Sequence, residues 1–376
     1  MANIIRVLHR GMSYNYGGME TFIYNIYKNI DKSKIQFDFI VPENTKIAYE
    51  NEIIKMGGRI YKEICSIKSK PIKYLTYEKN FLKSHKEIQI IHIHECSCCN
   101  LSILKHAYRR KIPVRILHSH NNQYLFKRNV TNKIKEKYYK SNLKKFTTNL
   151  FACSEDAGMW MFGDLDFTVI HNAIDCEKFT FNLIERNKIR RELKLENKIV
   201  YGHVGRFHDQ KNHTFILDIF YEIVKKRSNA ILLLIGDGEN RKAIMNKIDK
   251  LKLNSNVILL GLKSNIPEYL CAMDVFLFPS LYEGLGISLI EAQASGLISF
   301  ASEKVIPQEV KITDLVNFIS LNLSAKEWAE KIMDVDTTSI EKRKEYSIQV
   351  KNAGYDIKVE ALKLQNFYLE KLKNGK

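Results

Sequence analysis

The sequence predicts an α/β fold of two doubly wound domains with a cleft between them. Short apolar runs alternate with stretches of helical periodicity in both halves of the chain, which is typical of parallel sheets with crossover helices. The 376 residues are enough for about two domains of roughly 150 residues. A polar stretch at 176–197 separates the two series of strands, and we expect it to be the linker.

The first series of elements defines the expected N-terminal domain, residues 1–175. It starts with the apolar run Ile4–Leu8, a glycine-containing loop and a helix whose apolar residues recur from Phe22 to Ile30. Further apolar runs predict strands at 37–41, 88–93, 114–117 and 150–153. Because helical stretches separate most of these runs, we expect the strands to be parallel.

The second series restarts at Ile199–Val204 and defines the expected C-terminal domain, residues 198–354. A helix with apolar positions from Phe215 to Ile223 follows, and further strands are predicted at 231–235, 257–260 and 275–278. Ligands of such sheets bind beyond the carboxyl ends of the strands. Motifs that directly follow a predicted strand are therefore the first candidates for a site.

Composition excludes several classes of protein. The 45% hydrophobic content and six prolines are typical of a globular chain. No apolar run approaches the ~18 residues of a membrane span, and the first residues lack the basic start of a secretory signal. Seven cysteines, an odd number, favour reduced thiols over a disulfide framework. We expect a cytoplasmic protein.

The chain has 59 basic and 42 acidic residues, a net charge of +17, and much of the excess of basic residues lies between Lys105 and Lys145. This basic stretch holds 13 Lys and Arg against one acid, Glu136. It is either a solvated face or a surface for an anionic partner, nucleic acid or membrane lipid. No recognisable nucleic-acid-binding module accompanies it, so we do not expect nucleic acid. The cations are Lys105, Arg109, Arg110, Lys111, Arg115, Lys127, Arg128, Lys133, Lys135, Lys137, Lys140, Lys144 and Lys145, with the rings of Tyr108, Tyr124, Phe126, Tyr138 and Tyr139 among them.

Two glycine motifs follow predicted strands. Gly17-Gly18 opens the helix that contains Glu20, and it is either a flexible turn or a place where helix N–H groups meet an anion. Gly205-Arg206 ends a strand, and Lys211 stands five residues later. These two cations either neutralise a diphosphate or form surface salt bridges. Neither the dinucleotide pattern G-x-G-x-x-G nor the Walker pattern occurs at these motifs.

A third motif, Glu283-Gly-Leu-Gly-Ile-Ser-Leu-Ile-Glu291, directly follows the apolar run at 274–279. The first glutamate lies on a flexible loop and the second lies one to two turns into the next helix. Carboxylates accept hydrogen bonds from sugar hydroxyls, and a helix start offers N–H groups to phosphate. Since the flanking residues are mostly apolar or Gly, the two acids are expected to need a partner rather than to be solvated.

Four histidines lie at the ends of two predicted strands, namely His92, His94, His118 and His120. Alternate strand residues share a face, so a metal site is conceivable. Cys96, Cys98 and Cys99 follow, but no second cysteine pair stands at zinc-ribbon spacing. We expect no metal site. The preferred interpretation is one histidine acting through hydrogen bonds at a sugar site, with structural roles open for the others.

Four motifs in order resemble the retaining family-4 glycosyltransferases of the GT-B fold. They are Gly-Gly-x-Glu at 17–20, Gly-Arg-Phe-x-x-x-Lys at 205–211, Gly-Asp-Gly at 236–238 and Glu-x7-Glu at 283–291. The segments 114–121 and 210–213 resemble the branch that builds bacterial capsular polysaccharides and exopolysaccharides. The resemblance implies two Rossmann-like domains facing across the cleft. The N-terminal domain would bind the acceptor, the C-terminal domain would bind a nucleotide sugar, and a last helix at 355–376 would pack back on the first domain.

The resemblance also implies roles for single residues. Arg206 and Lys211 would hold the donor diphosphate, Glu291 the ribose and Glu283 the transferred sugar. The N-domain histidine of the family falls on His120, with His118 as the alternative register. The catalytic candidates are thus His120 and Glu283, and the donor-binding candidates are Gly17, Gly18, Gly205, Arg206, Lys211, Gly236, Leu262, Gly284, Leu285, Gly286 and Glu291.

These expectations amount to a retaining hexosyltransferase that uses a UDP-sugar and a lipid-linked saccharide acceptor in cell-surface polysaccharide synthesis. Arg206 and Lys211 would replace a divalent ion, so we expect neither metal nor cofactor; the Asp-x-Asp pairs at 164–166 and 334–336 are interpreted as surface acids. A lipid-linked acceptor is found only at a membrane, so we expect the basic stretch to bind the anionic cytoplasmic face of the cell membrane. The alternatives are a catalytically inert GT-B subunit that stabilises a partner enzyme, and a nucleotide-sugar epimerase.

Overall fold

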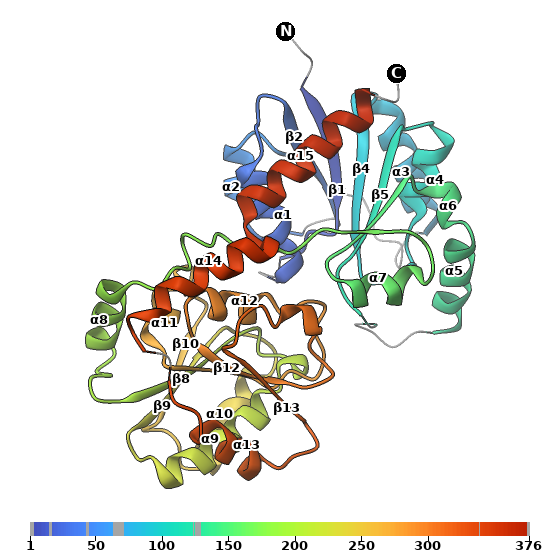
Figure 1. Cartoon of the computed structure of the whole chain (residues 1–376). Coiled ribbons are helices and arrows are strands. Elements are labelled where there is room, and N and C mark those ends of the chain that lie inside the picture. Colours follow the sequence, from blue (N-terminus) through green and yellow to red (C-terminus); the bar gives the residue numbers. More distant parts are fainter. Residues whose placement is uncertain are drawn as a thin grey trace. The chain divides into compact units, whose positions relative to one another are not determined.

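The computed structural model describes residues 4–14, 17–42, 45–62, 71–122, 124, 129–337 and 339–373. The chain divides into two compact units, one of Met1–Ala173 with Ile357–Lys376 and one of Ile174–Asp356 (Figure 1). Each unit contains its own parallel sheet. The predicted α/β class with two Rossmann-like sheets is thereby confirmed.

The first unit is built on a seven-stranded sheet in the order β3-β2-β1-β4-β5-β6-β7. Its strands are β1 (Ile5–Arg10), β2 (Ile35–Val41), β3 (Arg59–Lys62), β4 (Ile88–Glu95), β5 (Val114–Ser119), β6 (Asn149–Ala152) and β7 (Thr168–Val169). Its helices are α1 (Gly18–Asn29), α2 (Glu50–Lys55), α3 (Pro71–Ser84), α4 (Ser102–Arg109), α5 (Val130–Ser141), α6 (Leu143–Phe146), α7 (Glu155–Phe162) and α15 (Ile357–Lys373).

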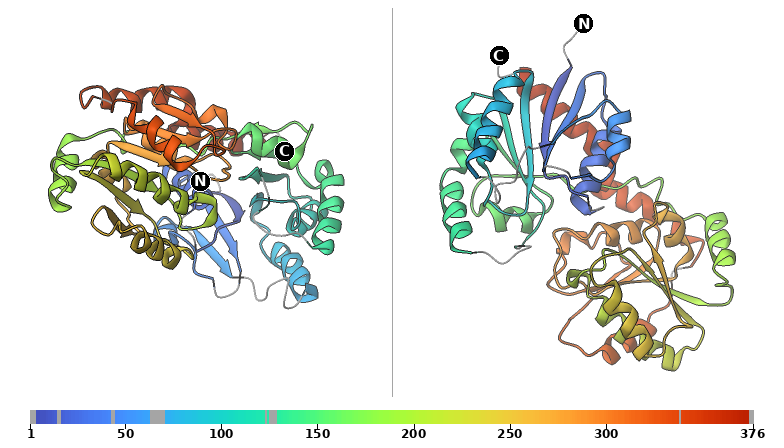
Figure 2. Two further views of the ribbon diagram at one scale, coloured as in Figure 1. Left: turned by 90° about the horizontal axis from the view of Figure 1, so that it is seen from below. Right: turned by 180° about the vertical axis from the view of Figure 1, so that it is seen from behind.

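Helices cover both faces of this sheet, because its central strands are apolar toward both sides. Figures 1 and 2 show α15 on one face and α3 and α4 on the other. On the α15 face, α1 buries Phe22, Ile23 and Ile26 at helical spacing. These side chains join one apolar core with Phe37 of β2 and Tyr368 of α15. The C-terminal helix thus completes the core of the N-terminal unit.

The second unit is built on a six-stranded sheet in the order β10-β9-β8-β11-β12-β13. Its strands are β8 (Ile199–Val204), β9 (Ala230–Ile235), β10 (Val257–Gly261), β11 (Val275–Phe278), β12 (Ile298–Ser302) and β13 (Val316–Ile319). Its helices are α8 (Leu183–Glu192), α9 (His213–Lys226), α10 (Arg241–Lys250), α11 (Ile266–Ala272), α12 (Ile287–Ala294), α13 (Ala325–Met333) and α14 (Tyr346–Val350). Helices α10 and α13 pack on α9, while α8 packs on α11 and α14 on α12.

The expected linker at 176–197 differs from the structure, because this segment belongs to the second unit and carries α8. The Arg186 guanidinium of α8 donates to the carbonyl oxygens of Cys271 and Met273 at 3.0 Å and to Asp274 Oδ1 at 2.6 Å. Polar sequence here reflects a helix held by buried hydrogen bonds and ion pairs, which a hydropathy pattern does not distinguish from a solvated connection. None of the helices in the described ranges is both long and apolar enough to cross a bilayer.

Candidate active site

The second sheet reverses its strand order between β8 and β11, which lie side by side through the pairs Tyr201–Val275 and Gly202–Phe276. Doubly wound sheets bind ligands at such a switch point, beyond the carboxyl ends of the two strands. The Gly205–Lys211 motif follows β8, and the Glu283–Glu291 motif follows β11. Strand order therefore brings together two motifs that lie about 70 residues apart in the chain.

The backbone at this edge is closely packed. Gly205 N–H donates to the Ile235 carbonyl oxygen at 3.0 Å, so the turns after β8 and β9 touch. Gly236 has a φ of +139°, and a Cβ at this position would lie 2.0 Å from the carbonyl oxygen of Gly205. Only glycine fits such a conformation and contact. The two candidate glycines thus bring the turns after β8 and β9 into contact beside Arg206.

An ion pair joins the two motifs. Lys211 Nζ lies 2.6 Å from Glu283 Oε1, and the two side chains are only 15% and 6% exposed. Gln210 adds a hydrogen bond from Nε2 to Glu283 Oε2 at 3.3 Å and another to the Tyr282 carbonyl oxygen at 3.0 Å. Lys211 Nζ also lies 4.8 Å from the centre of the Phe278 ring. Both charges are shielded from water and neutralise each other.

Arg206 lies apart from this pair. Its guanidinium contacts Glu239 at 3.1 Å, and both side chains are about half exposed. His208 contacts the same carboxylate at 3.5 Å. An exposed ion pair of this kind contributes little stability, since water competes for both charges. The guanidinium can therefore exchange Glu239 for another anion at low cost.

Helix α12 begins at Ile287, inside the second motif, with an N-terminus free of side-chain capping. Its N-cap is Gly286, with a φ of +85°, and no side chain accepts a hydrogen bond there. Four helices elsewhere begin instead at capping side chains, those of Asn129, Ser154, Asn182 and Ser324. Unpaired N–H groups at a helix start carry partial positive charge and bind phosphate or sugar oxygens. Gly284 and the buried Leu285 form the loop that leads into this start.

Glu291 lies on α12 and is partly buried. Burial raises the pKa of its carboxyl to about 8, although the positive charges of Lys178 and Lys211 oppose the shift. The ammonium of Lys211 therefore interacts electrostatically with Glu291 as well as with Glu283. A carboxyl in this state is poised to gain from any hydrogen-bond donor that stabilises its ionised form.

Leu262 does not join this group directly. It follows β10 at the edge of the sheet, two strands away from β8, and is 68% exposed. Of the candidates in this unit, the structure therefore gathers the donor-binding residues Gly205, Lys211 and Gly236 and the catalytic candidate Glu283 with the start of α12. Arg206 and Leu262 lie at the exposed margin.

The first unit presents its candidates at the carboxyl edge of its own sheet, near the switch point between β1 and β4. Gly17 is the N-cap of α1 and offers no capping side chain. Glu20 lies buried behind it and accepts a hydrogen bond from Ser13 Oγ at 2.5 Å, while burial raises the pKa of its carboxyl. His120 directly follows β5 and is 8% exposed.

A fifth histidine that the sequence pattern did not single out, His9, lies on β1 and joins the four predicted histidines. All five are buried between the sheet and the helices α1 and α15. Their positions alternate along β1, β4 and β5, so one face of the sheet carries every ring. His9 stands alone in an apolar run, and only the pairing of β1 with β4 reveals its neighbours.

Two family models match the chain. The one described as Glycosyltransferase Family 4 matches residues 16–178, and the one described as Glycosyl transferases group 1 matches residues 185–353. EpsF of Bacillus subtilis (strain 168), which is named as a glycosyltransferase, is 32% identical over 370 residues, 96% of each chain. The chain belongs to this glycosyltransferase family. The family expected from the four motifs is thus confirmed.

Further relatives of this glycosyltransferase extend the comparison. CapH of Staphylococcus aureus, named a capsular polysaccharide biosynthesis glycosyltransferase, is 26% identical over 378 residues, 98% of this chain and 99% of CapH. An Escherichia coli enzyme named UDP-Gal:alpha-D-GlcNAc-diphosphoundecaprenol alpha-1,3-galactosyltransferase is 32% identical over 137 residues, 35% of each chain. The structure of Anabaena Alr3699/HepE in complex with UDP and glucose has a TM-score of 0.74 at 16% identity, covering 98% of this chain and 99% of HepE. This likeness shows the GT-B fold.

Removing the ammonium of Lys211 is expected to destabilise this glycosyltransferase. In Lys211→Met the Glu283 carboxylate stays shielded from water without its cation, so the free energy of unfolding should fall by about 3 kcal/mol. Chemical denaturation measures the loss. The double variant Lys211→Met/Glu283→Gln should recover most of it, because a neutral amide needs no cation. Lys225→Met removes an exposed pair with Glu222 on α9 and serves as control. Equal losses in the two lysine variants would contradict the buried character of the Lys211–Glu283 pair.

Glu291 is expected to make stability fall as pH rises. Its pKa is about 8 in the folded chain and near 4.5 in the unfolded chain, so between these values the folded state holds a proton that the unfolded state has released. The contribution of Glu291 to the free energy of unfolding of the wild type therefore decreases from about pH 4.5 to about pH 8. Glu291→Gln lacks this contribution and should lose less Tm over that range. Glu192→Gln, an exposed change on α8, should follow the wild type.

Proposed function

We propose that this glycosyltransferase moves a hexose from a UDP-sugar to a lipid-linked saccharide, with retention at the anomeric carbon, in the synthesis of a cell-surface polysaccharide. The observation that carries the proposal is the Lys211–Glu283 pair beside the uncapped start of α12, at the switch point of the second sheet. The names of CapH and of the Escherichia coli galactosyltransferase support the polysaccharide and the lipid diphosphate. The UDP complex of HepE supports the donor.

The charges of the site suit a nucleotide diphosphate. Arg206 can turn from Glu239 to a phosphate oxygen, and Lys211 can shift from Glu283 to another. Glu283 is then free to accept hydrogen bonds from sugar hydroxyls. We assign the ribose to Glu291, whose ionised form the ribose hydroxyls would stabilise, and the base to the backbone near Leu262. Further contacts to the donor would come from the backbone of Gly205 and Gly236 and of the loop Gly284, Leu285 and Gly286.

The first unit would supply Gly17 and Gly18 to the phosphates and His120 to the transferred sugar. Both glycines lie at the start of α1, whose N-terminus would offer backbone N–H groups to the phosphates, with the Glu20 carboxyl already hydrogen-bonded to the backbone of Gly17. His120 is a neutral imidazole, because burial lowers its pKa to about 3. It can therefore donate or accept a hydrogen bond without carrying charge.

We also propose that the chemistry needs no divalent ion. Two cations from Arg206 and Lys211 offset most of the charge that develops on the leaving diphosphate. Glu283 is engaged with Lys211 and, by proposal, with sugar hydroxyls, which leaves it unsuited to attack the anomeric carbon. Retention would then follow from attack on the face that the diphosphate leaves, with the diphosphate taking the proton of the acceptor hydroxyl.

Turnover of UDP-sugars by the purified chain tests the function. Incubation with UDP-hexoses and a lipid-diphosphate saccharide in EDTA should give a product whose anomeric NMR coupling shows the α configuration of the donor. Absence of turnover with every donor would favour the inert subunit, and conversion of the donor without acceptor into an epimer would favour the epimerase. A β product, or activity that EDTA abolishes and Mn²⁺ restores, would overturn the proposed mechanism.

Arg206→Ala and Glu291→Gln should each lower kcat/KM for the donor by roughly 30- to 5,000-fold. Each removes a charged hydrogen bond to the donor, and truncating one such partner costs about 2–5 kcal/mol. Arg191→Ala and Glu192→Gln change the same residue types on the exposed face of α8 and should leave the kinetics unaltered. Values for both site variants within about threefold of the wild type, below ~1 kcal/mol, would refute the assignment.

We further propose that the basic stretch docks on an anionic membrane. The stretch includes the helices α5 and α6. Helix α5 exposes the side chains of Val130, Ile134 and Tyr138 to solvent, at 71%, 65% and 41% of their surface. These positions are four residues apart, so they form one apolar stripe, with Lys133 and Lys137 beside it. Exposed apolar residues flanked by lysines are typical of helices that lie in a membrane interface. Phe126, Lys127 and Arg128 fall outside the described residues.

Vesicle sedimentation tests the docking. The chain should bind anionic vesicles at low salt and leave them at high salt, since each basic residue near the surface contributes about 1 kcal/mol that salt screens. Changing Lys133, Lys137, Lys140 and Lys144 to Gln should weaken binding and leave donor affinity unchanged. The matched control changes Lys242, Lys250, Lys326 and Lys331, which are exposed in the second unit, to Gln. Equal binding to neutral and anionic vesicles, or none to either, would refute the proposal.

A further inference from the structure

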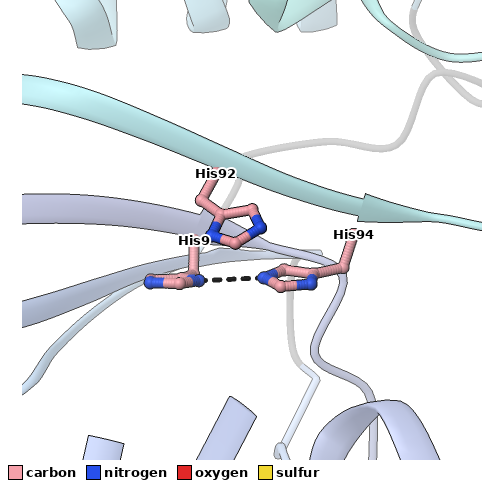
Figure 3. Close-up of side chains that lie close together, drawn as sticks. All are labelled: His9, His92 and His94. Carbon is pink, nitrogen blue, oxygen red and sulfur yellow. Dashed lines mark hydrogen bonds between the residues drawn. The ribbon is translucent and has the colours of Figure 1, made fainter. Parts of the chain in front are cut away.

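The five buried histidines of the first unit form two separate hydrogen-bonded chains. In one chain, His9 Nδ1 lies 3.0 Å from His94 Nε2, and His94 Nδ1 lies 2.8 Å from His120 Nε2. In the other chain, the Tyr368 hydroxyl lies 2.6 Å from His92 Nδ1, and His92 Nε2 lies 3.1 Å from His118 Nδ1. Figure 3 shows His9 and His94 joined end to end, with the His92 ring above them.

The charge and bonding of these rings do not suit a metal site. Two groups of three, sharing His94, are close enough to hold an ion, and among the described residues the candidate groups contain histidines alone. Both nitrogens of His94 and both of His92 already face hydrogen-bond partners. A divalent cation without an anionic ligand would also leave its charge uncompensated in an apolar core.

Every ring in the first chain is neutral. Burial lowers the pKa of His9 and of His120 to about 3, and lowers that of His94 well below its ordinary value. A neutral imidazole has one N–H donor and one bare acceptor nitrogen. The three rings can therefore satisfy both contacts in only two ways, with all the protons directed toward His120 or all directed toward His9.

The two ends of the chain decide between these directions. Among the residues that the structure describes, none pairs with His9 Nε2 or His120 Nδ1. One end of the histidine chain must therefore carry an unpaired N–H. His9 is 1% exposed, and its ring packs beside those of Phe37 and Phe39 on β2, with ring centres 4.0 and 5.7 Å away. His120 follows β5 at the carboxyl edge of the sheet and is 8% exposed. Both nitrogens are buried in the free protein. An N–H without a partner is least costly at the end that lies nearer to a ligand site, which for a parallel sheet is the carboxyl edge.

We infer that His9 and His94 are positioning residues that set the tautomer of His120, so that its Nδ1 carries the proton and donates to an oxygen of bound substrate. In this direction His9 Nδ1–H donates to His94 Nε2, and His94 Nδ1–H donates to His120 Nε2. His120 becomes a neutral donor with a fixed ring orientation. The identity of the accepting oxygen rests on the proposed function, whereas the tautomer is a property of the free protein.

The tautomer can be measured directly by NMR on the protein with ¹⁵N-labelled histidine, since ring nitrogens that carry a proton have shifts distinct from bare ones. In the wild type, His120 should show a protonated Nδ1 and a bare Nε2. His94→Phe keeps an aromatic ring but removes the donor, so His120 should shift toward the tautomer with the proton on Nε2. His94→Asn places an amide N–H near the position of Nδ1 and should restore the wild-type tautomer.

Kinetics give the second readout. His94→Phe should lower kcat/KM for the donor about ten- to a hundredfold, the range for loss of one hydrogen bond in a buried site, and His94→Asn should recover most of it. His92→Phe is the matched control, because His92 is equally buried two residues earlier on β4 and belongs to the other chain. It should leave both the His120 tautomer and kcat/KM unchanged.

Three results would overturn the inference. They are a bare His120 Nδ1 in the wild type, a stoichiometric metal ion in the purified protein, and equal kinetic losses in His92→Phe and His94→Phe. If no UDP-sugar is turned over, the proposed function fails, and the NMR measurement on the free protein still decides whether the chain sets the tautomer. The two failures are therefore distinguishable.

Discussion

The carboxyl ends of all strands in a parallel sheet lie along one side of it, and this constraint determines where the candidate residues of each unit lie. Gly17 follows β1, His120 follows β5, Arg206 follows β8 and Glu283 comes shortly after β11. The same constraint requires crossover helices on both faces, so each sheet is buried on both sides and its loops alone are free to vary. Where the strand order reverses, two of these loops diverge and leave backbone N–H groups exposed. The Lys211–Glu283 pair occupies that position in the second unit.

Much of this architecture could be predicted from the sequence, because unbroken apolar runs indicate strands that are buried on both faces. The runs at 199–204 and 275–278 coincide with β8 and β11. Four strands were missed for physical reasons: β3 and β7 lie at the edge of the first sheet, where few positions need to be apolar, and β12 and β13 carry serine or asparagine within short runs. Sequence spacing identified Lys211 and Glu283 separately, but their 2.6 Å contact depends on the pairing of β8 with β11.

Buried arginines explain why a charged segment of the second unit, 176–197, was expected to be a linker. Arg343 is 3% exposed and donates to the carbonyl oxygens of Leu270, Met273 and Ser295, which lie at the ends of α11 and α12. Arg186 binds the same end of α11 from the opposite direction in sequence. Carbonyl groups at a helix end have no partner within the helix, so cations that approach them in the interior are well satisfied. Segments that look like charged connections are thus fixed parts of the second unit.

The chain leaves the first unit after Ala173 and returns to it at Ile357. The apolar core that contains Phe22 and Phe37 also contains Tyr368, Leu364 and Ala361 of α15, which are synthesised after the whole second unit. A ribosome that has completed the seven strands of the first sheet has therefore not yet supplied the helix that closes one of its faces. Domains usually fold in the order of synthesis, but here the N-terminal domain must wait, with part of its core open, until the C-terminal domain has emerged. A stop codon ahead of Ile357 would consequently remove part of the core of a domain whose strands are encoded far upstream.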